Sequence, residues 1–233
     1  MIPGLLWGAA GIALAGAGAH ATFHRNSPLF GRALSRLPTR ERLVALTFDD
    51  GPHPQTTPIV LDALAAEGVP ATFFILGCYA ERWPDIVRRA VDEGHEVANH
   101  GYFHRRLHFA GPRVVRDDLE RGTSAVARAT GIRPRLFRAP HGFRSPFVSP
   151  VARSLGQAIV GWTYGVWDSD RPGAEAIARR TLAGARPGAI VLLHDADGHN
   201  PDGDRRQTAE ALPKIIRGLR EGGYELVKLP ATD

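Results

Sequence analysis

TFDDGP, residues 47–52, joins an apolar run, 43–48, to two adjacent carboxylates and a Gly-Pro break. This order predicts a buried strand that ends in a turn, with Asp49 and Asp50 at its carboxyl end. Because side chains alternate across a strand, adjacent aspartates point to different sides, which suits one for binding a metal and the other for handling a proton. The competing interpretation is a turn whose aspartates cap the following helix. Other stretches of the chain must decide between the two.

Composition indicates one catalytic domain. The chain has 233 residues, of which 43% are hydrophobic and 23% charged, so it can bury a full core. A single cysteine, Cys78, excludes an internal disulfide framework and a multi-thiolate metal site.

The net charge of +5 is concentrated near the N-terminus. Residues 24–46 carry five arginines against one acidic residue, Glu41, and the rest of the chain is nearly neutral. A nucleic-acid-binding domain needs its cations gathered on the folded surface, so we expect no nucleic-acid partner.

Residues 2–23 carry no formally charged side chain and are long enough to cross a hydrocarbon core of about 30 Å. We therefore predict a transmembrane anchor over residues 1–23, a basic linker over 24–41 and a single-pass protein of the cell membrane. A cleaved signal peptide is the alternative, because Ala19-His20-Ala21 resembles a cleavage site. The arginines that follow the segment favour a cytoplasmic catalytic domain by the positive-inside rule.

Beyond the linker, strand-like and helix-like runs alternate. Repeated strand-helix units predict parallel pairing, and their number favours an α/β barrel, with a doubly wound open sheet as the alternative. The predicted strands are 43–49, 71–77, 95–99, 136–140, 158–164, 189–193 and 224–229, and the predicted helices are 57–67, 84–93, 114–130, 146–155, 174–185 and 208–221.

A barrel gathers its catalytic groups at the carboxyl ends of its strands. The polar candidates obey this rule, since each follows a predicted strand: Asp49, Asp50, His100, Arg138, Asp168 and His194.

His100 and His104 are four residues apart, a spacing that lets two imidazoles reach one ion. With one aspartate they make three ligands and leave a position open for water, as in a catalytic zinc site. Taken alone, the spacing is weak evidence, because loop histidines four residues apart are more often solvated or hydrogen-bonded than bound to a metal.

Read in order, TFDDGP, NHGYFH (99–104), RAPHG (138–142), the Trp167-Asp168 region and LLHD (192–195) resemble the polysaccharide deacetylase family. This family is also called carbohydrate esterase family four, or the NodB homology domain. The resemblance runs from about residue 42 to 230, which makes residues 42–233 the predicted domain. It implies a distorted seven-stranded (β/α) barrel, a divalent metal such as zinc, and removal of acetyl groups from sugars.

The resemblance also implies a role for each matching residue. Asp50, His100 and His104 match the metal ligands. Asp49 matches the catalytic base and Arg138 its partner, while His194 matches the catalytic acid and Asp168 its partner. Leu192 matches a leucine that lines the pocket. From the chemistry of amide hydrolysis, we further expect the backbone N–H of His141 to donate to the oxyanion.

This sequence departs from the family pattern in three places. Gly101 stands where the family usually has Ser or Thr, so a hydroxyl that would brace the metal site is missing. His141 replaces an aromatic residue. VWDSDRPG (166–173) lacks the usual Asp-Trp order, and Asp168 is preferred over Asp170 as the partner of the acid.

The remaining polar residues are given simpler interpretations. We expect His53, His95, His108 and His199 to be loop or surface histidines, because three protein ligands already complete the site. The acidic stretch 195–204 lacks the pattern of a calcium-binding loop and is expected to be a solvated rim loop.

The predicted function is a metal-dependent hydrolase that removes an N-acyl group from an amino sugar, with an N-acetylated carbohydrate and the membrane as partners and no obligate protein partner. One alternative is a deformylase or deacetylase of a lipid-linked sugar. The other is a membrane-tethered carbohydrate-binding module without activity. Family resemblance favours a catalytic domain outside the cell, against the charge rule.

Overall fold

The computed structural model describes residues 16, 18–20, 22–24 and 26–230, and within them one parallel sheet forms the centre. The strands run in the order β5-β4-β3-β2-β1-β7-β6, and β8 pairs with β1. Their bounds are β1 (Leu43–Asp49), β2 (Thr72–Ile75), β3 (Glu96–Asn99), β4 (Leu136–Phe137), β5 (Ala158–Ile159), β6 (Tyr164–Gly165), β7 (Ala189–His194) and β8 (Glu225–Leu226).

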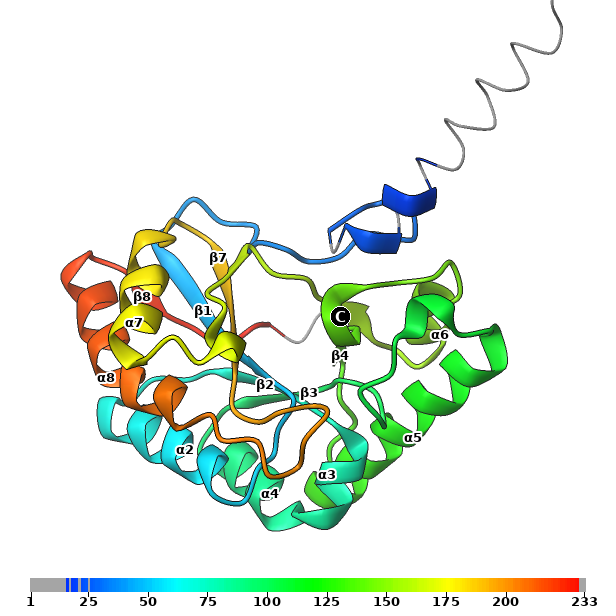
Figure 1. Ribbon diagram of the computed structural model, residues 1–233, viewed down its shortest axis with the longest axis horizontal. Coiled ribbons are helices and arrows are strands. Elements are labelled where there is room, and N and C mark those ends of the chain that lie inside the picture. Colours follow the sequence, from blue (N-terminus) through cyan, green and yellow to red (C-terminus); the bar gives the residue numbers. More distant parts are fainter. Residues whose placement is uncertain (1–15, 17, 21, 25, 231–233) are drawn as a thin grey trace, which may run out of the picture.

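The helices lie around the outside of this curved sheet (Figure 1). All six predicted helices are present, and the sequence missed only the short α3, which begins at a glycine inside the run that we assigned to a strand. The helices are α2 (Thr56–Glu67), α3 (Gly77–Arg82), α4 (Pro84–Asp92), α5 (Pro112–Thr130), α6 (Val148–Ser154), α7 (Ala174–Ala183) and α8 (Arg206–Glu221).

Strand β1 is the axis of the sheet. It is buried along nearly its whole length and pairs in parallel with β2, β7 and β8. Its register places Asp49 opposite His194 of β7 and Phe74 of β2, so the carboxyl ends of these strands are level. Side chains that end neighbouring strands therefore meet at one rim.

The α/β class and the parallel sheet are confirmed, but the prediction of a seven-stranded barrel is wrong in strand number and closure. The run predicted as one strand, 158–164, forms two short strands, β5 and β6, which are the two ends of the strand order. The N-terminal segment pairs with backbone groups that strand–strand pairing would use in a closed barrel. Leu34 donates to the Ile159 carbonyl and Leu37 donates to the Gly188 carbonyl. The result is a half-barrel.

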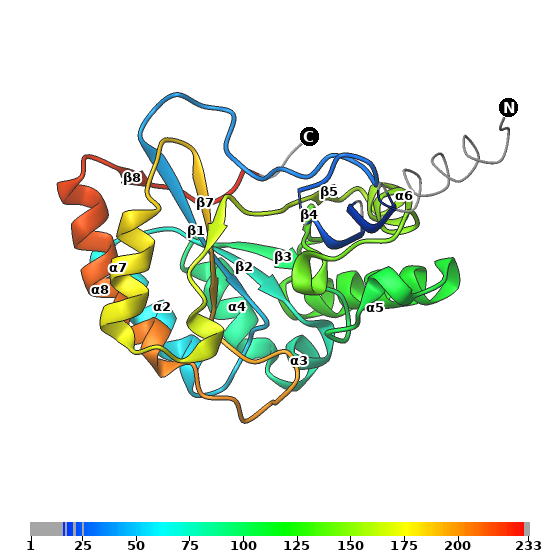
Figure 2. The same cartoon turned by 45° about the horizontal axis from the view of Figure 1, so that its top comes forward.

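The segment predicted as a linker thus packs on the domain. Figure 2 shows it, in blue, running from the region of α6 and β5 toward β1. The Asn26 amide donates to the Trp162 carbonyl at 3.0 Å, and the buried guanidinium of Arg144 donates to the carbonyls of Ser27 and Gly31. Residues 26–37 therefore help to hold the half-barrel together.

The anchor predicted over residues 1–23 falls largely outside the described residues. Among those that are described, no helix combines the length and the apolar character needed to span a bilayer.

Candidate active site

A pocket of about 620 Å³ opens at the carboxyl ends of the strands. Arg138 lies behind its wall and is fully buried. The other eight predicted site residues line the pocket, namely Asp49, Asp50, His100, His104, His141, Asp168, Leu192 and His194.

The two adjacent aspartates diverge for a reason that the sequence did not reveal. Asp49 is the last residue of β1, whereas Asp50 lies beyond the strand and has a left-handed backbone with φ 77°. The turn begins at Asp50 itself, and this left-handed residue makes the two carboxylates diverge. We expected the alternation of side chains along a strand to separate them, and that reason was wrong. Non-glycine residues held in this region cluster at functional sites, and His141 and Trp167, which also line the pocket, share it.

Asp50, His100 and His104 meet, with one ligand atom from each within 4.8 Å of the others. Asp50 Oδ1 lies 3.4 Å from His100 Nε2 and 3.2 Å from His104 Nε2. Burial tends to raise the pKa of Asp50, but the nearby imidazoles outweigh it and hold this pKa below its usual range. Asp50 Oδ1 is buried and has no hydrogen-bond partner among the described residues. One carboxylate and two imidazoles around such an oxygen fit a zinc-type ion with an open coordination position.

The two imidazoles are supported differently. His100 follows β3, is 1% exposed, and its Nδ1 lies 2.8 Å from the Arg138 carbonyl. A proton on Nδ1, donated to this carbonyl, leaves the Nε2 lone pair facing Asp50, the orientation that a metal-binding histidine needs. His104 comes from a loop, and its Nδ1 lies 3.1 Å from His199 Nε2. Burial lowers the pKa of His104 to about 3, so this ring is neutral.

Asp49 is paired with Arg138. The guanidinium donates to Asp49 Oδ1 at 2.6 Å, to the Thr47 hydroxyl at 2.8 Å and to the Gly161 carbonyl at 2.8 Å. It also lies 4.0 Å from the ring centre of Phe74. Burial lowers the pKa of Arg138, and the charge of Asp49 opposes that effect. The arginine fixes one carboxylate oxygen and leaves Oδ2 on the side of His100, 3.8 Å from its Nε2.

His194 is paired with Asp168 on the other side of the pocket. Asp168 Oδ1 lies 2.9 Å from His194 Nδ1, and Oδ2 accepts from the His194 backbone N–H at 2.7 Å and from Thr208 at 2.9 Å. Burial opposes a charge on His194, but Asp168 outweighs it and raises the pKa of this imidazole to about 9. Between Asp168 and Asp170, the contacts single out Asp168.

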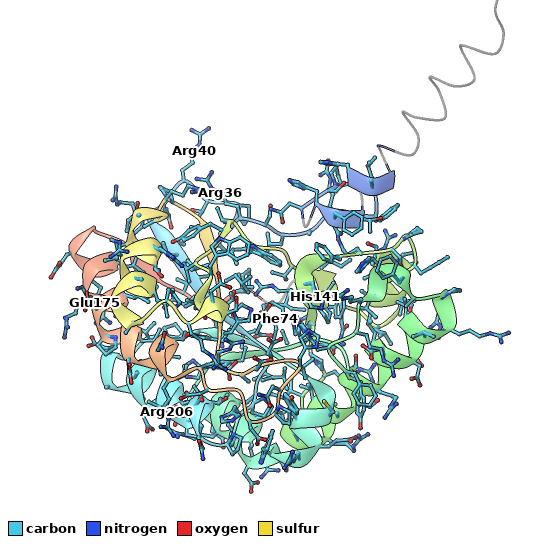
Figure 3. The ribbon with its side chains drawn as sticks, viewed as in Figure 1. Arg36, Arg40, Phe74, His141, Glu175 and Arg206 are labelled. Atoms are coloured by element: carbon cyan, nitrogen blue, oxygen red, sulfur yellow. The ribbon has the colours of Figure 1, made fainter. Side chains whose placement is uncertain are left out.

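His141 is carried by a short 3-10 turn (Pro140–Gly142) and has φ 60°. Figure 3 shows His141 and Phe74 near the middle of the view, whereas Arg36 and Arg40 project from its edge. Within the described part of the chain, the His141 backbone N–H makes no hydrogen bond. It is therefore free for a ligand, as its predicted role requires.

Asp118 of α5 occupies the space that a side chain at position 101 would take. A Cβ on Gly101, whose φ is +86°, would lie 2.4 Å from Asp118 Oδ2. The buried Asp118 carboxylate accepts from the backbone N–H groups of Tyr102 and Phe103, each at 3.2 Å. Burial raises the pKa of Asp118, and these two hydrogen bonds oppose the rise. The loop that carries His104 is thus braced by a carboxylate from another helix instead of a local hydroxyl.

The stretch 195–204 is a rim loop with several exposed residues, as predicted, but its first residue is not solvated. Asp195 is fully buried and accepts from the Thr57 hydroxyl at 2.5 Å, and burial raises its pKa to about 7. The Gly198 N–H donates to Asp50 Oδ2 at 3.1 Å, and His199 contacts His104. The orange connection between β7 and α8 in Figure 1 is this loop, and through Gly198 it lies against Asp50. His53 and His95, predicted as loop or surface histidines, lie in loops and are buried.

Comparison with known proteins agrees with this geometry. Residues 36–160 match the family model described as polysaccharide deacetylase. The match includes Asp49, Asp50, His100, His104 and Arg138, while Asp168 and His194 lie beyond it. The chain is 42% identical to a chitooligosaccharide deacetylase of Bradyrhizobium sp., over 81% of this chain and 90% of that protein.

The chain belongs to the polysaccharide deacetylase family. The family and the enzyme class predicted from the motifs, a carbohydrate deacetylase, are thereby confirmed. A peptidoglycan-N-acetylglucosamine deacetylase of Bacillus cereus is 37% identical over 82% of this chain and 88% of its own. A solved peptidoglycan N-acetylglucosamine deacetylase superposes with a TM-score of 0.80 at 33% identity, covering 85% of this chain and 91% of that one.

Proposed function

We propose that this chain hydrolyses the N-acetyl amide of amino sugars in a glycan, giving acetate and a free amine. One observation carries the proposal: the Arg138-bound carboxylate of Asp49 and the Asp168-bound imidazole of His194 line the same pocket as the Asp50–His100–His104 cluster. Amide hydrolysis needs an acceptor for the proton of water and a donor to the leaving nitrogen. This pocket has a candidate for each.

Asp50, His100 and His104 would hold the metal ion through Oδ1 and the two Nε2 atoms. The ligand types favour zinc. When bound, such an ion supplies a Lewis acid that polarises the acetyl carbonyl and lowers the pKa of water. The contact of His100 with the Arg138 carbonyl and that of His104 with His199 would keep the Nε2 lone pairs of both rings directed to the ion.

Asp49 would take the proton of the attacking water. Because Arg138 occupies Oδ1 at 2.6 Å, Oδ2 is the oxygen that remains for proton transfer. The backbone N–H of His141 would donate to the oxyanion that forms as water adds to the carbonyl carbon. Water thus gives its oxygen to the acyl group and a proton to Asp49.

His194 would protonate the amine as the C–N bond breaks. Its Nδ1 is engaged by Asp168, so Nε2 carries the proton that is transferred. A pKa raised to about 9 keeps the imidazole charged near neutral pH, as a general acid requires. Exchange with solvent then returns a proton to His194 and removes one from Asp49.

The pocket wall suits a sugar substrate. Trp162, Tyr164 and Trp167 line it together with Leu192, and Trp167 is 70% exposed. Aromatic rings give a flat apolar contact with polar edges, and Leu192 offers an apolar contact for the acetyl methyl group. The names of the relatives, which refer to chitooligosaccharide and peptidoglycan, support N-acetylglucosamine-containing glycans as the substrate class.

The purified zinc-loaded protein, incubated with N-acetylated chitooligosaccharides, peptidoglycan or a lipid-linked N-acyl sugar, tests the proposal. We expect acetate and new amines in equal amounts from at least one of the first two. Binding without acyl release from any of them would identify a carbohydrate-binding module instead. Release from the lipid-linked sugar alone would overturn the substrate class and leave the chemistry standing.

A further inference from the structure

Three histidines meet at the rim of the pocket: His104, His141 and His199. One ligand atom from each lies within 4.8 Å of the others. The ring centres of His104 and His141 are 4.4 Å apart, and those of His104 and His199 are 4.6 Å apart. His104 directs Nε2 to Asp50 and Nδ1 to His199. One imidazole therefore faces two groups of ligands through its two nitrogens.

The loop that carries His199 is held in place by several contacts. The Asp197 carboxylate accepts from the backbone N–H groups of His199 and Asn200 and from the Arg205 guanidinium. A Cβ at Gly198 would lie 2.5 Å from the ring of His104, so only glycine allows this close approach. His199 is thus positioned against His104 by the backbone of its own loop.

His141 contributes an unsatisfied nitrogen. Its Nε2 is buried and has no hydrogen-bond partner among the described residues. Its ring stacks on that of His199, with centres 5.3 Å apart and an interplanar angle of 23°. A buried imidazole nitrogen of this kind needs a partner, and a divalent transition metal is one that it can bind.

We propose that His104 Nδ1, His141 and His199 form a second site for a divalent transition metal, adjoining the Asp50–His100–His104 site and sharing His104. Its location beside a first ion rests on the proposed function. Three imidazoles are ligands that suit Zn²⁺, Cu²⁺ and Ni²⁺. This site has no carboxylate ligand, in contrast to the first.

Filling both sites requires one proton to leave. With the first ion on Nε2 of His104, Nδ1 carries the remaining proton, and a second ion can bind Nδ1 only as that proton passes to the solvent. The ring then bridges the two ions as an imidazolate, with no change of oxidation state. Because His141 and His199 line the substrate pocket, a second ion there obstructs the sugar. Excess metal therefore inhibits the enzyme.

Zinc titration of the protein that already holds one equivalent tests this site. We expect wild type to bind a second zinc ion with release of one proton, measured by calorimetry in buffers of different ionisation enthalpy. His141→Phe, which restores an aromatic ring, and His199→Asn should each weaken the second event at least tenfold. Both should retain the first ion, which also shows that they fold. His24→Asn, an exposed histidine outside the pocket, is the matched control.

Inhibition provides a second measurement, with each protein's activity at one equivalent of zinc as its own reference. Wild type and His24→Asn should lose activity over the range in which the second ion binds, and the two pocket variants should not. A single zinc ion bound to wild type would overturn the proposal. The proposal would also be overturned if His199→Asn bound the first zinc ion more weakly and wild type showed no second binding event. His199 would then only orient His104. Absence of deacetylation at one equivalent would count against the proposed function and not against this site.

Discussion

The pocket has two layers that differ in how their side chains are held. The strand layer consists of Asp49, Asp50, His100 and His194, which end or directly follow β1, β3 and β7. His100 is 1% exposed and contacts a backbone carbonyl. In the loop layer, His104, His141 and His199 contact one another, and His199 is exposed. Sheet register fixes the first layer, whereas the second depends on pairs of residues far apart in the sequence. We therefore expect loss of a strand-layer side chain to abolish chemistry, and loss of the Asp118 support of the His104 loop to weaken metal binding.

The largest effect is expected from the ligands that the strand ends supply. Asp50→Ala and His100→Ala each remove one of three ligands, so metal content and acetate release should both fall to background. Elemental analysis of the purified variants checks this, with circular dichroism to show that the fold is kept. Full metal occupancy in either variant would refute the ligand assignment.

Asp49→Asn should separate chemistry from metal binding. It removes the proposed base without touching a ligand, so metal content should be retained while turnover falls by about 10²–10⁴-fold, as is usual for general bases. Steady-state kinetics together with metal analysis tests this expectation. Turnover close to that of wild type would show that water loses its proton to another group.

Asp168→Asn should change the pH dependence. Asp168 raises the pKa of His194 to about 9, so activity that needs the imidazolium is lost as pH rises through this value. Without the carboxylate charge the pKa falls, and the basic limb of the pH–rate profile should move to lower pH. Asp170→Asn, at an exposed neighbouring position, is the control and should leave the limb in place.

The same pair predicts a pH dependence of stability in the metal-free protein. His194 has a folded pKa of about 9 against an ordinary value of 6.5, so the folded state binds the proton more tightly. The stabilisation is complete below pH 6.5 and disappears as pH rises toward 9. Thermal unfolding across this window should show the loss in wild type and a smaller loss in Asp168→Asn; equal slopes would contradict the pairing.

The smallest effect is expected at Asp118 of α5, which supports the loop layer from outside. Asp118→Ala removes the brace of the His104 loop and should weaken metal affinity about 10–100-fold, as outer-shell substitutions do. Gly101→Ala should act in the same direction, because its Cβ would meet Asp118 and the backbone has φ +86°. Asp117→Ala, the exposed neighbour on α5, is the control. Unchanged affinity in Asp118→Ala would show that the loop holds itself.

The strand layer could be predicted from the sequence because each residue follows an apolar run, and parallel strands bring such positions to one rim. The pairing of His194 with Asp168 also agreed with the motif. The loop layer could not be predicted in this way. Nothing in the local sequence shows that Asp118, seventeen residues after Gly101, fills its missing side-chain space, or that His199 reaches His104.

Closure of the barrel was mispredicted for the same kind of reason. The run 158–164 has a strand composition, but Leu34 exchanges backbone hydrogen bonds with Ile159 and Gly161. Gly161 also leaves room for Asn26, whose Oδ1 would lie 2.3 Å from a Cβ at this position. Competition between distant segments decided this part of the fold, and single-sequence patterns do not report such competition.

We propose that removal of N-acetyl groups depends on a metal held at the strand ends, with Asp49 and His194 on either side. Acetate release from N-acetylated chitooligosaccharide or peptidoglycan by wild type, stripped of metal and then reloaded with one equivalent of zinc, tests it most directly. We expect no release from the stripped protein, full recovery on reloading, and no recovery by Asp50→Ala. Equal release before and after stripping, or recovery by Asp50→Ala, would contradict it.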